Sequence, residues 1–278
     1  MLRVPQSYID SLLESDWALH DVTTEGMGLR GECLVTAWPK QTGIVAGIDI
    51  AERIFQTVGL KTEKLHADGD HVLMNTPVLR ASGTPEQLHA SYKIAQCVME
   101  YATGIARRTH HMVSIAQSRC ERIQVAGTRK HFPGGKIISI VGLRAGGGII
   151  HRAGLSDSIL VFDQHRVLSD DPVQAVRRLM MMEPERKVCV EVDTPEDGMF
   201  WADQGVHVIQ CERFSPEVLA AFVREVKAAH PAVIINAAGG VNGENVAEYA
   251  DAGCDVLVTS WPYFGKPADI KMQFSPAA

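Results

Sequence analysis

The hydrophobic pattern of the chain becomes regular after residue 120. Short apolar runs rich in Val and Ile alternate there with segments that have the apolar spacing of amphipathic helices. We expect strands at Arg122–Ala126, Ser158–Phe162, Lys187–Val192, His207–Cys211, Ala232–Ala237 and Asp255–Thr259. We expect helices at Pro172–Met182, Thr194–Asp203, Pro216–Ala229 and Gly243–Ala252. This alternation predicts parallel βα units and favours a βα barrel. A doubly wound sheet is the weaker alternative, because no Gly-x-Gly-x-x-Gly turn follows the first strand.

Before residue 107 the pattern is mixed. Apolar spacing predicts helices at Tyr8–Ser15, Gly47–Val58 and Pro85–Thr103, and a strand at Gly31–Ala37. The turn residues Asp68-Gly69-Asp70 lie between two short strand-like segments. Strands and helices without strict alternation predict an α+β arrangement. Farther along, Lys136–Leu143 is rich in β-branched residues and would be a strand on propensity alone, so its state stays open.

Length and composition place the chain among ordinary globular proteins. It has 278 residues, 46% of them hydrophobic and 22% charged, which suits one large domain or two modest ones. No stretch is long and apolar enough for a membrane span, and the first residues lack the apolar core of a signal peptide. We therefore expect a cytoplasmic protein without a membrane partner.

Positive charge is concentrated in one part of the chain. The net charge is −6, yet residues 107–152 contain nine Lys or Arg residues and a single acid, Glu121. A local basic block in an acidic protein suits a small polyanion held in one cleft. It argues against general nucleic-acid binding, which is typical of broadly basic domains.

Two cation-bearing segments lie where a barrel builds its active site, in the loops at the carboxyl ends of strands. Arg129 and Lys130 follow the strand Arg122–Ala126, and His151 and Arg152 follow three consecutive glycines. Arg binds carboxylate or phosphate bidentately, and Lys adds a point charge. We interpret both segments as anion-binding, with an ordinary exposed turn and a flexible linker as the alternatives.

Acidic residues end two neighbouring predicted strands. Glu191 lies near the end of Lys187–Val192, and Glu212 directly follows His207–Cys211. Two such carboxylates facing one cleft are suited to hold Mg²⁺ or to stabilise developing positive charge, the alternative being a pair with a cation. His165 follows the strand Ser158–Phe162, where a functional and a structural role are equally open.

A glycine-rich loop, Ala237–Gly243, joins the strand Ala232–Ala237 to the predicted helix Gly243–Ala252. Backbone amides at helix starts bind phosphate, and barrels often bind phosphate after their late strands. We expect Gly239, Gly240 and Asn242 to bind phosphate here. The residues alone thus predict a phosphorylated, multiply anionic substrate on a metal-assisted βα barrel.

At this point the order and spacing of three motifs resemble the quinolinate phosphoribosyltransferase (nicotinate-nucleotide pyrophosphorylase) family. The motifs are Thr103–Ala106, Thr128–Gly134 and Gly146–Leu155, and the resemblance runs from about residue 21 to about residue 263. The ending Val258–Tyr263, followed by Pro267–Lys271, is similar to the ModD branch, which is found with molybdenum-transport genes.

The resemblance implies an α/β fold in two parts. An open, seven-stranded βα barrel of the type II phosphoribosyltransferase kind would span residues 108–264. An N-terminal α/β sandwich domain would span residues 1–107, where the tail 265–278 can pack. A helix at Lys136–Leu143 is implied as well. So is a homodimer, or a higher oligomer, in which one subunit's N-terminal domain covers the other's barrel mouth.

The resemblance also implies an activity: phosphoribosyl transfer from 5-phosphoribosyl 1-diphosphate with Mg²⁺. Arg129, Lys130, His151 and Arg152 match substrate-binding cations of the family, Glu191 matches an acid near ribose and metal, and Gly239 and Gly240 match a phosphate loop. We expect Lys130, Glu191 and Glu212 to act in catalysis, with Glu191 and Glu212 holding the metal. We expect Lys93 and His165 to join the substrate-binding residues.

Several positions depart from the family pattern. Phe162 replaces an active-site lysine in the family's Leu-Ile-Lys-Asp-Asn-His, and Lys93 replaces an arginine donated across the dimer. Cys211-Glu212-Arg213 occupies the position of the family's Leu-Asp-Asn, and Ala238 occupies the position of a family serine. A charged hydrogen bond contributes about 1.5–3 kcal/mol, so these losses would shift acceptor affinity by one to several decades.

Three hypotheses follow. The first is a phosphoribosyltransferase that acts on an unidentified carboxylated heterocycle and is linked to molybdenum transport. The second is quinolinate phosphoribosyltransferase (decarboxylating) of NAD biosynthesis. The third is a non-catalytic protein that binds a phosphosugar or another anion on the same scaffold.

Overall fold

The structure is a computed structural model that describes residues 2–277. The chain divides into two compact units, each built from separate stretches. The first unit contains Met1–His110, Phe132–Gly147 and Tyr263–Ala278, and the second contains His111–His131 and Gly148–Pro262. Within residues 2–277, no helix has the length and apolar character needed to cross a membrane.

The first unit is built on an antiparallel sheet of four strands in the order β13-β1-β5-β3. The strands are β1 (Cys33–Pro39), β3 (Lys61–Lys64), β5 (Leu79–Gly83) and β13 (Ile270–Pro276), and β2 (Gly43–Ile44) pairs separately with β4 (His71–Val72). Its helices are α1 (Gln6–Glu14), α2 (Val22–Met27), α3 (Ile48–Thr57) and α5 (Lys136–Ala145), together with the first part of α4 (Pro85–Arg119). The predicted helices and the predicted strand of this region are confirmed, and α4 extends well beyond the predicted Thr103.

Helix α3 shows why this unit folds locally as it does. Ile48, Ala51, Ile54 and Phe55 are buried at helical spacing and join the main core of the unit. Gly47 precedes the helix at φ +83°, and a Cβ there would lie 2.9 Å from the Val98 carbonyl oxygen. Only glycine fits this entry into the helix.

The ambiguous segment Lys136–Leu143 is helical and forms most of α5. Its strand propensity is overridden by packing, because Ile138 and Val141 contact buried residues of the first unit. Gly142 permits a close approach to α4: a Cβ at this position would lie 2.5 Å from the Ala102 carbonyl oxygen.

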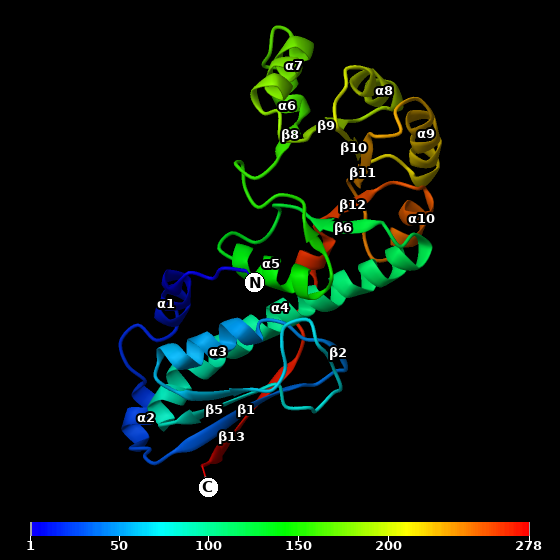
Figure 1. The fold of residues 1–278 in the computed structure, drawn as a ribbon. Coiled ribbons are helices and arrows are strands. Elements are labelled where there is room, and N and C mark those ends of the chain that lie inside the picture. The colour runs from blue at the N-terminus through cyan, green and yellow to red at the C-terminus, as the bar shows by residue number, and fades with distance from the viewer. Residues whose placement is uncertain (1, 278) are drawn as a thin grey trace. The chain divides into compact units, whose positions relative to one another are not determined.

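The second unit is built on a parallel sheet of seven strands in the order β7-β6-β12-β11-β10-β9-β8 (Figure 1). The strands are β6 (Gln124–Gly127), β7 (Ile149–Ile150), β8 (Ile159–Val161), β9 (Val188–Val192), β10 (Val208–Glu212), β11 (Ile234–Ala238) and β12 (Val256–Thr259). The edge strands β7 and β8 do not pair with each other, so the barrel is open, as expected. All six strands predicted after residue 120 are confirmed, whereas β7 was missed because two residues make no pattern.

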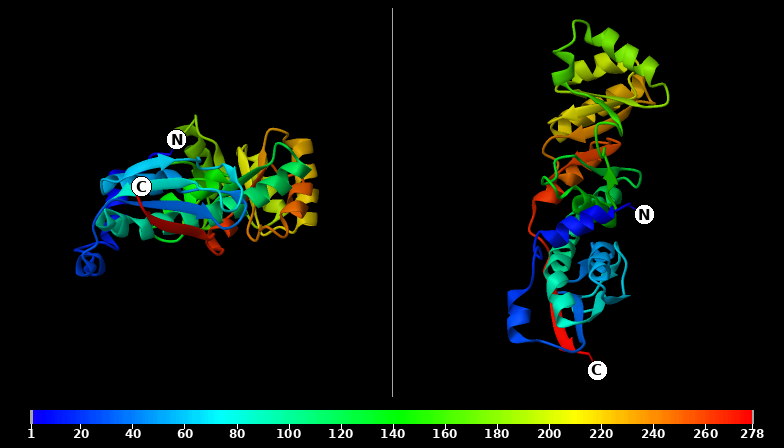
Figure 2. Two further views of the ribbon diagram at one scale, coloured as in Figure 1. Left: turned by 90° about the horizontal axis from the view of Figure 1, so that it is seen from below. Right: turned by 90° about the vertical axis from the view of Figure 1, so that its left-hand side faces the viewer.

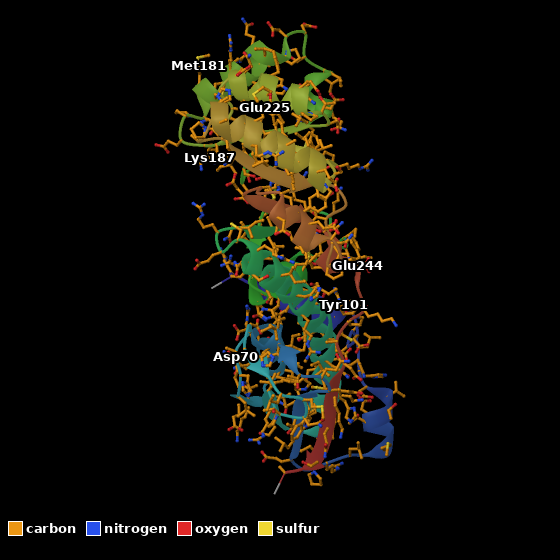
Figure 3. The ribbon with its side chains drawn as sticks, turned by 90° about the vertical axis from the view of Figure 1, so that its right-hand side faces the viewer. Asp70, Tyr101, Met181, Lys187, Glu225 and Glu244 are labelled. Atoms are coloured by element: carbon orange, nitrogen blue, oxygen red, sulfur yellow. The ribbon has the colours of Figure 1, made fainter. Side chains whose placement is uncertain are left out.

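Helices cover one face of this sheet. They are α6 (Asp163–Arg166), α7 (Pro172–Met182), α8 (Pro195–Asp203), α9 (Pro216–Ala229) and α10 (Val246–Asp251), and the 3₁₀ helix η1 (Trp261–Phe264) follows β12. Figure 1 shows α8, α9 and α10 along the sheet, and Figure 2 shows strands β9 to β12, coloured yellow to red-orange, beside one another. Outward-facing positions such as Met181 and Glu225 are exposed (Figure 3).

The predicted start of the last helix at Gly243 is wrong, because α10 begins at Val246 and has six residues. The side chain of Asn242 causes the delay. Its Oδ1 accepts hydrogen bonds from the backbone N–H groups of Glu244 (2.8 Å) and Asn245 (3.2 Å), which holds these residues in a turn.

Strand alternation gives the sheet two different faces. Val190, Ile209, Ile235 and Leu257 belong to the large core on the helix side. The residues next to them in sequence point to the concave side, where the lower layer is apolar and includes Cys189 and Val208. The upper layer, toward the carboxyl ends of the strands, is polar and forms the site described next.

Candidate functional site

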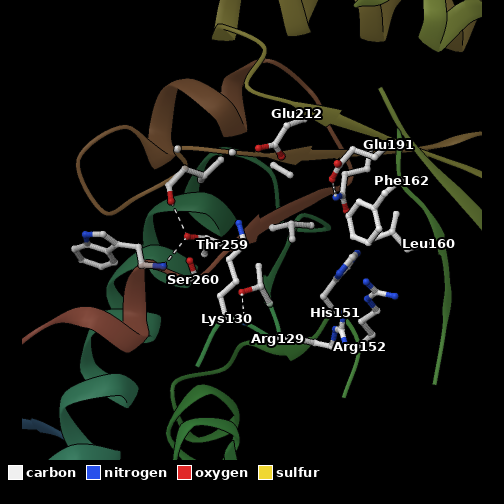
Figure 4. A pocket seen from close by; sticks show the side chains of 18 of the residues that line it. Arg129, Lys130, His151, Arg152, Leu160, Phe162, Glu191, Glu212, Thr259 and Ser260 are labelled. Carbon is white, nitrogen blue, oxygen red and sulfur yellow. Dashed lines mark hydrogen bonds between the residues drawn. The ribbon is translucent and has the colours of Figure 1, made fainter. Parts of the chain in front are cut away.

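A cavity of about 390 Å³ opens at the carboxyl ends of the parallel strands. It brings together nine of the predicted site residues: Arg129, Lys130, His151, Arg152, Glu191, Glu212, Gly239, Gly240 and Asn242. The basic residues lie on one side of the cavity, across from Glu191 and Glu212 (Figure 4). The cavity therefore offers separate surfaces for negative and positive parts of one substrate.

The basic side is held by the ends of β6 and β7. The backbone N–H of Lys130 donates to Thr128 Oγ1 at 3.1 Å, and that of His151 donates to the Gly127 carbonyl at 3.1 Å. Arg129 and Lys130 are exposed to solvent, whereas Arg152 is only 7% exposed. Its guanidinium Cζ lies 5.1 Å from the centroid of the Phe162 ring, as expected for a cation–π contact.

Burial changes the charges on this side. The pKa of His151 is lowered to about 4, chiefly by burial and further by the neighbouring positive charge of Arg152. His151 is therefore neutral near pH 7 and adds a hydrogen-bonding imidazole instead of a charge. Burial, with the charge of Arg129, also lowers the pKa of Arg152, which nonetheless stays protonated as Arg does in proteins.

The acidic side is formed by β9 and β10. Glu191 Oε2 accepts a hydrogen bond of 2.6 Å from Gln210 Nε2, and Glu212 Oε1 lies 3.5 Å from Arg213 Nε. Burial is the main cause that raises the pKa of Glu191, and the negative charge of Glu212 raises it further. Two carboxylates on the same side of a cavity, one of which raises the pKa of the other, are suited to share a cation.

These carboxylates fit Mg²⁺ only in combination with a substrate. Within residues 2–277, no group of three His, Cys, Asp or Glu side chains could hold a metal ion. Mg²⁺ commonly binds proteins through one or two carboxylates and takes its other ligands from substrate phosphates and water. Glu191 and Glu212 supply that number of hard oxygen ligands.

The glycine loop after β11 has a backbone that only glycine adopts readily. Gly239 and Gly240 have φ values of +80° and +92°. A Cβ at Gly239 would lie 2.6 Å from Glu212 Oε1, whereas the same atom at Gly240 would meet nothing within 4 Å. Gly240 thus leaves space at the cavity wall for an anion, and Gly239 leaves space for Glu212.

Asn242 shapes this loop from within. Its Nδ2 donates to the Gly240 carbonyl at 3.1 Å, and Asn245 Nδ2 donates to the same oxygen at 3.1 Å. Because its side-chain atoms hold the turn, Asn242 positions the backbone. Because α10 has only six residues, an anion at this loop would meet the backbone of the glycine loop and not the N-terminus of a long helix.

Two predicted site residues do not line the cavity. Lys93 lies on α4 in the first unit, exposed, with its Nζ donating to Gln96 Oε1 at 2.9 Å. His165 lies on α6, where its Nδ1 accepts a hydrogen bond of 3.0 Å from the Phe162 backbone N–H. His165 therefore caps a short helix and stacks on Phe162 with 5.8 Å between ring centroids.

Several lining residues were not predicted as site residues: Thr128, Leu160, Gln210, Val241, Val258, Thr259, Ser260 and Trp261. Thr259 Oγ1 donates to the Val241 carbonyl at 2.6 Å and accepts from the Trp261 N–H at 3.0 Å, which joins two loops of the site. The strand-end rule applied to Asp255–Thr259 would have found Thr259 and Ser260. Gln210 was detectable as a polar residue in an otherwise apolar strand.

Comparison with known proteins agrees with this geometry. Residues 21–103 match the family described as quinolinate phosphoribosyl transferase, N-terminal domain, and residues 105–273 match the corresponding C-terminal domain. A Pasteurella multocida protein named "Putative pyrophosphorylase ModD" is 34% identical over 278 residues, which are 98% of each chain. A Methanothermobacter thermautotrophicus protein named "Probable nicotinate-nucleotide pyrophosphorylase" is 29% identical over 253 residues, covering 90% of this chain and 91% of the relative.

Solved structures show the same fold. The nicotinate-nucleotide pyrophosphorylase from Ehrlichia chaffeensis has a TM-score of 0.91 at 22% identity and covers 99% of this chain and 100% of its own. Both family domains are thus present in one chain whose fold is that of solved members. The chain belongs to the quinolinate phosphoribosyltransferase family and is a phosphoribosyl-transferring enzyme.

Proposed function

We propose that this enzyme transfers the phosphoribosyl group of 5-phosphoribosyl 1-diphosphate to a carboxylated aromatic heterocycle other than quinolinate. The observation that carries the proposal is the position of Phe162. Val161 pairs with Val190, which brings the following residues Phe162 and Glu191 side by side at the cavity wall (Figure 4). An apolar ring therefore occupies part of the wall that faces the acceptor.

The number of positive charges in the cavity limits the acceptor. Arg129, Lys130 and Arg152 are the cationic side chains among the lining residues, since His151 is neutral near pH 7. A diphosphate leaving group requires positive charge, which leaves few cations for a second substrate. One carboxylate at Arg152, with an aromatic ring against Phe162, fits these surfaces better than a dicarboxylate does.

The glycine loop fits the 5-phosphate of the co-substrate. Gly239 and Gly240 line the cavity, and the open space at Gly240 lets a phosphate approach the backbone of the loop closely. Glu212 lies between this loop and Glu191 on the same side of the cavity, where the ribose of a bound co-substrate would lie (Figure 4).

In the proposed reaction, a ring nitrogen of the acceptor forms a bond to the anomeric carbon of the ribose. The bond from that carbon to the diphosphate oxygen breaks, and its electron pair leaves with the diphosphate. Arg129 and Lys130 stabilise the negative charge of the leaving group, and the carboxylates of Glu191 and Glu212 stabilise the positive charge that develops on the ribose. Mg²⁺, when bound, supplies charge neutralisation to the diphosphate.

The proposal includes a homodimer with shared sites. Lys93 does not line the cavity of its own chain, and in such a dimer it would contribute to the cavity of the partner subunit. The support is the family resemblance and the exposure of Lys93. Light scattering measures the oligomer. Mixing two inactive variants, Lys93→Ala and Glu191→Gln, is expected to restore part of the activity if each site uses both subunits.

Quinolinate itself is the second candidate acceptor, favoured by the name of the Methanothermobacter relative. The non-catalytic hypothesis is not adopted, because the chain belongs to an enzyme family.

A link to molybdenum transport rests on the resemblance to the ModD branch and stays a prediction. Its test is growth of a strain without this gene when molybdate is limiting.

The deciding experiment measures diphosphate release from 5-phosphoribosyl 1-diphosphate and Mg²⁺ with a panel of pyridine, pyrimidine and pyrrole carboxylates. Release with a monocarboxylate and not with quinolinate supports the proposal. Release with quinolinate, accompanied by carbon dioxide, would establish the second candidate. Co-substrate binding without release with any acceptor would return the non-catalytic hypothesis to consideration.

A further inference from the structure

A second cavity, which we name the edge cavity, lies in the second unit along the unpaired side of the edge strand β8. It has a volume of about 290 Å³. Its walls come from β8, from the loop before it, and from α6 and α7, which lie next to β8 in Figure 1. The volume is close to the lower end of the range for small-molecule sites, about 300 Å³.

Most of the wall is apolar. Leu155, Ile159, Val161, Val176 and Leu179 contribute aliphatic side chains, and no Asp or Glu lines the cavity. Transfer from water into this cavity would therefore be favourable for an apolar group of modest size.

One end of the edge cavity carries a positive charge that has no salt-bridge partner among residues 2–277. Arg152 is 7% exposed and lines both the edge cavity and the cavity at the carboxyl ends of the strands, which we name the catalytic cavity after its proposed function. Within residues 2–277, no carboxylate oxygen lies within 4.0 Å of its guanidinium nitrogens. Arg166, the other arginine of the wall, is already paired with Asp197 at 2.6 Å. A buried cation without a partner carboxylate is costly and favours an anion.

We propose that the edge cavity binds a small amphipathic monocarboxylate, with its carboxylate at Arg152 and its apolar part among Leu155, Val176 and Leu179. Binding there does not depend on the proposed transferase reaction. One consequence does rest on it: because Arg152 also faces the catalytic cavity, the bound carboxylate competes with the carboxylate of the acceptor. The ligand then acts as an inhibitor that raises the apparent KM for the acceptor.

The test uses hexanoate as the probe and hexanamide as its uncharged control, titrated calorimetrically into the full chain without any other ligand. Hexanoate is expected to bind about ten- to a hundredfold more tightly than hexanamide, since a charged hydrogen bond separates the two. In Arg152→Gln the two ligands are expected to bind equally. Equal binding of both ligands to the unaltered protein, or no binding of hexanoate at millimolar concentration, overturns the proposal.

A second variant locates the ligand. Ala175 lines the edge cavity from an exposed position on α7, and it does not line the catalytic cavity. Ala175→Phe fills the edge cavity and is expected to abolish hexanoate binding while 5-phosphoribosyl 1-diphosphate still binds. Hexanoate that binds this variant unchanged lies elsewhere, and the proposal then fails. Because hexanoate has no ring nitrogen and no turnover is measured, these results stand whether or not the proposed acceptor class is correct.

Discussion

The guanidinium of Arg152 lies over the ring of Phe162, with 5.1 Å between Cζ and the ring centroid. This contact places an aromatic face and a buried cation on the same part of the catalytic cavity. An acceptor that pairs a carboxylate with Arg152 brings its own ring toward Phe162. In the proposed function the pair selects the acceptor by charge and by shape, so Phe162 is the first residue to replace.

Replacing Phe162 with lysine is expected to improve the use of quinolinate. The new ammonium supplies a charged hydrogen bond to a second carboxylate, which corresponds to a fall of about ten- to a hundredfold in KM for quinolinate. Steady-state diphosphate release with quinolinate measures the change. Phe162→Leu, which removes the ring and adds no charge, is the control. A Phe162→Lys enzyme no better than Phe162→Leu with quinolinate contradicts the assignment.

Replacing Arg129 with alanine is expected to lower kcat/KM for 5-phosphoribosyl 1-diphosphate by at least about tenfold, because a charged contact to the leaving group is lost. Arg178 on α7 is the matched control, since it is exposed and lines neither cavity. Arg178→Ala should keep the activity of the unaltered protein. Full activity in Arg129→Ala would place the diphosphate elsewhere.

The Gly239→Ala substitution is expected to abolish most activity. The left-handed backbone makes alanine unfavourable by about 1–2 kcal/mol, and the Cβ would also meet Glu212 Oε1 at 2.6 Å. Gly205 is a matched control: its φ is +81°, nothing lies within 4 Å of its Cβ position, and it does not line the catalytic cavity. Gly239→Ala should lose more thermal stability than Gly205→Ala because of this contact, and at a temperature where both variants are folded only Gly239→Ala should lose transfer. Equal activities would refute the role of the loop.

Removing one carboxylate is expected to weaken the response to Mg²⁺. Glu212→Gln keeps the shape of the side chain and removes its charge, so half-maximal activity should require more Mg²⁺. Glu225→Gln, an exposed change on α9 (Figure 3), serves as the control and should leave the Mg²⁺ response unaltered. Diphosphate release is measured as a function of Mg²⁺ concentration for both variants and the unaltered protein. A Glu212→Gln curve identical to that of the unaltered protein would exclude Glu212 as a metal ligand.

His151 makes stability depend on pH. Its folded-state pKa of about 4 lies below the ordinary value of 6.5, so between these pH values the unfolded chain binds a proton that the folded chain does not. Stability therefore falls as the pH drops from 6.5 toward 4, by at most about 1.4 kcal/mol per pH unit. His151→Gln should show a smaller drop in Tm over this range than the unaltered protein. Parallel Tm curves for the two proteins would show that His151 is not buried as described.

Local signals account well for what the sequence predicted. The bounds of α7 and α9 are correct to the residue because each begins with proline after a capping side chain, Asp171 or Ser215. The cavity residues were found because parallel strands bring their carboxyl ends to one edge of the sheet. Those signals are short-range or follow directly from the sheet topology.

The remaining features depend on distant partners. Lys136–Leu143 is helical because the first unit packs around it, and its neighbours in sequence say nothing of that contact. The role of His165 depends on a single backbone N–H, that of Phe162, and the edge cavity depends on an arginine that no pattern marks as buried. Such features follow from tertiary packing and are visible only in the structure.

The first unit draws its central sheet from both ends of the chain. Strand β1 pairs with β5 on one side and with β13 on the other, so that Cys33 lies opposite Pro276. During synthesis, β13 can pair with β1 only after the intervening residues 40–269 have been made. The sheet of the first unit therefore stays incomplete until β13 has been made, and a stop codon before Ile270 would leave β1 as an open, aggregation-prone edge.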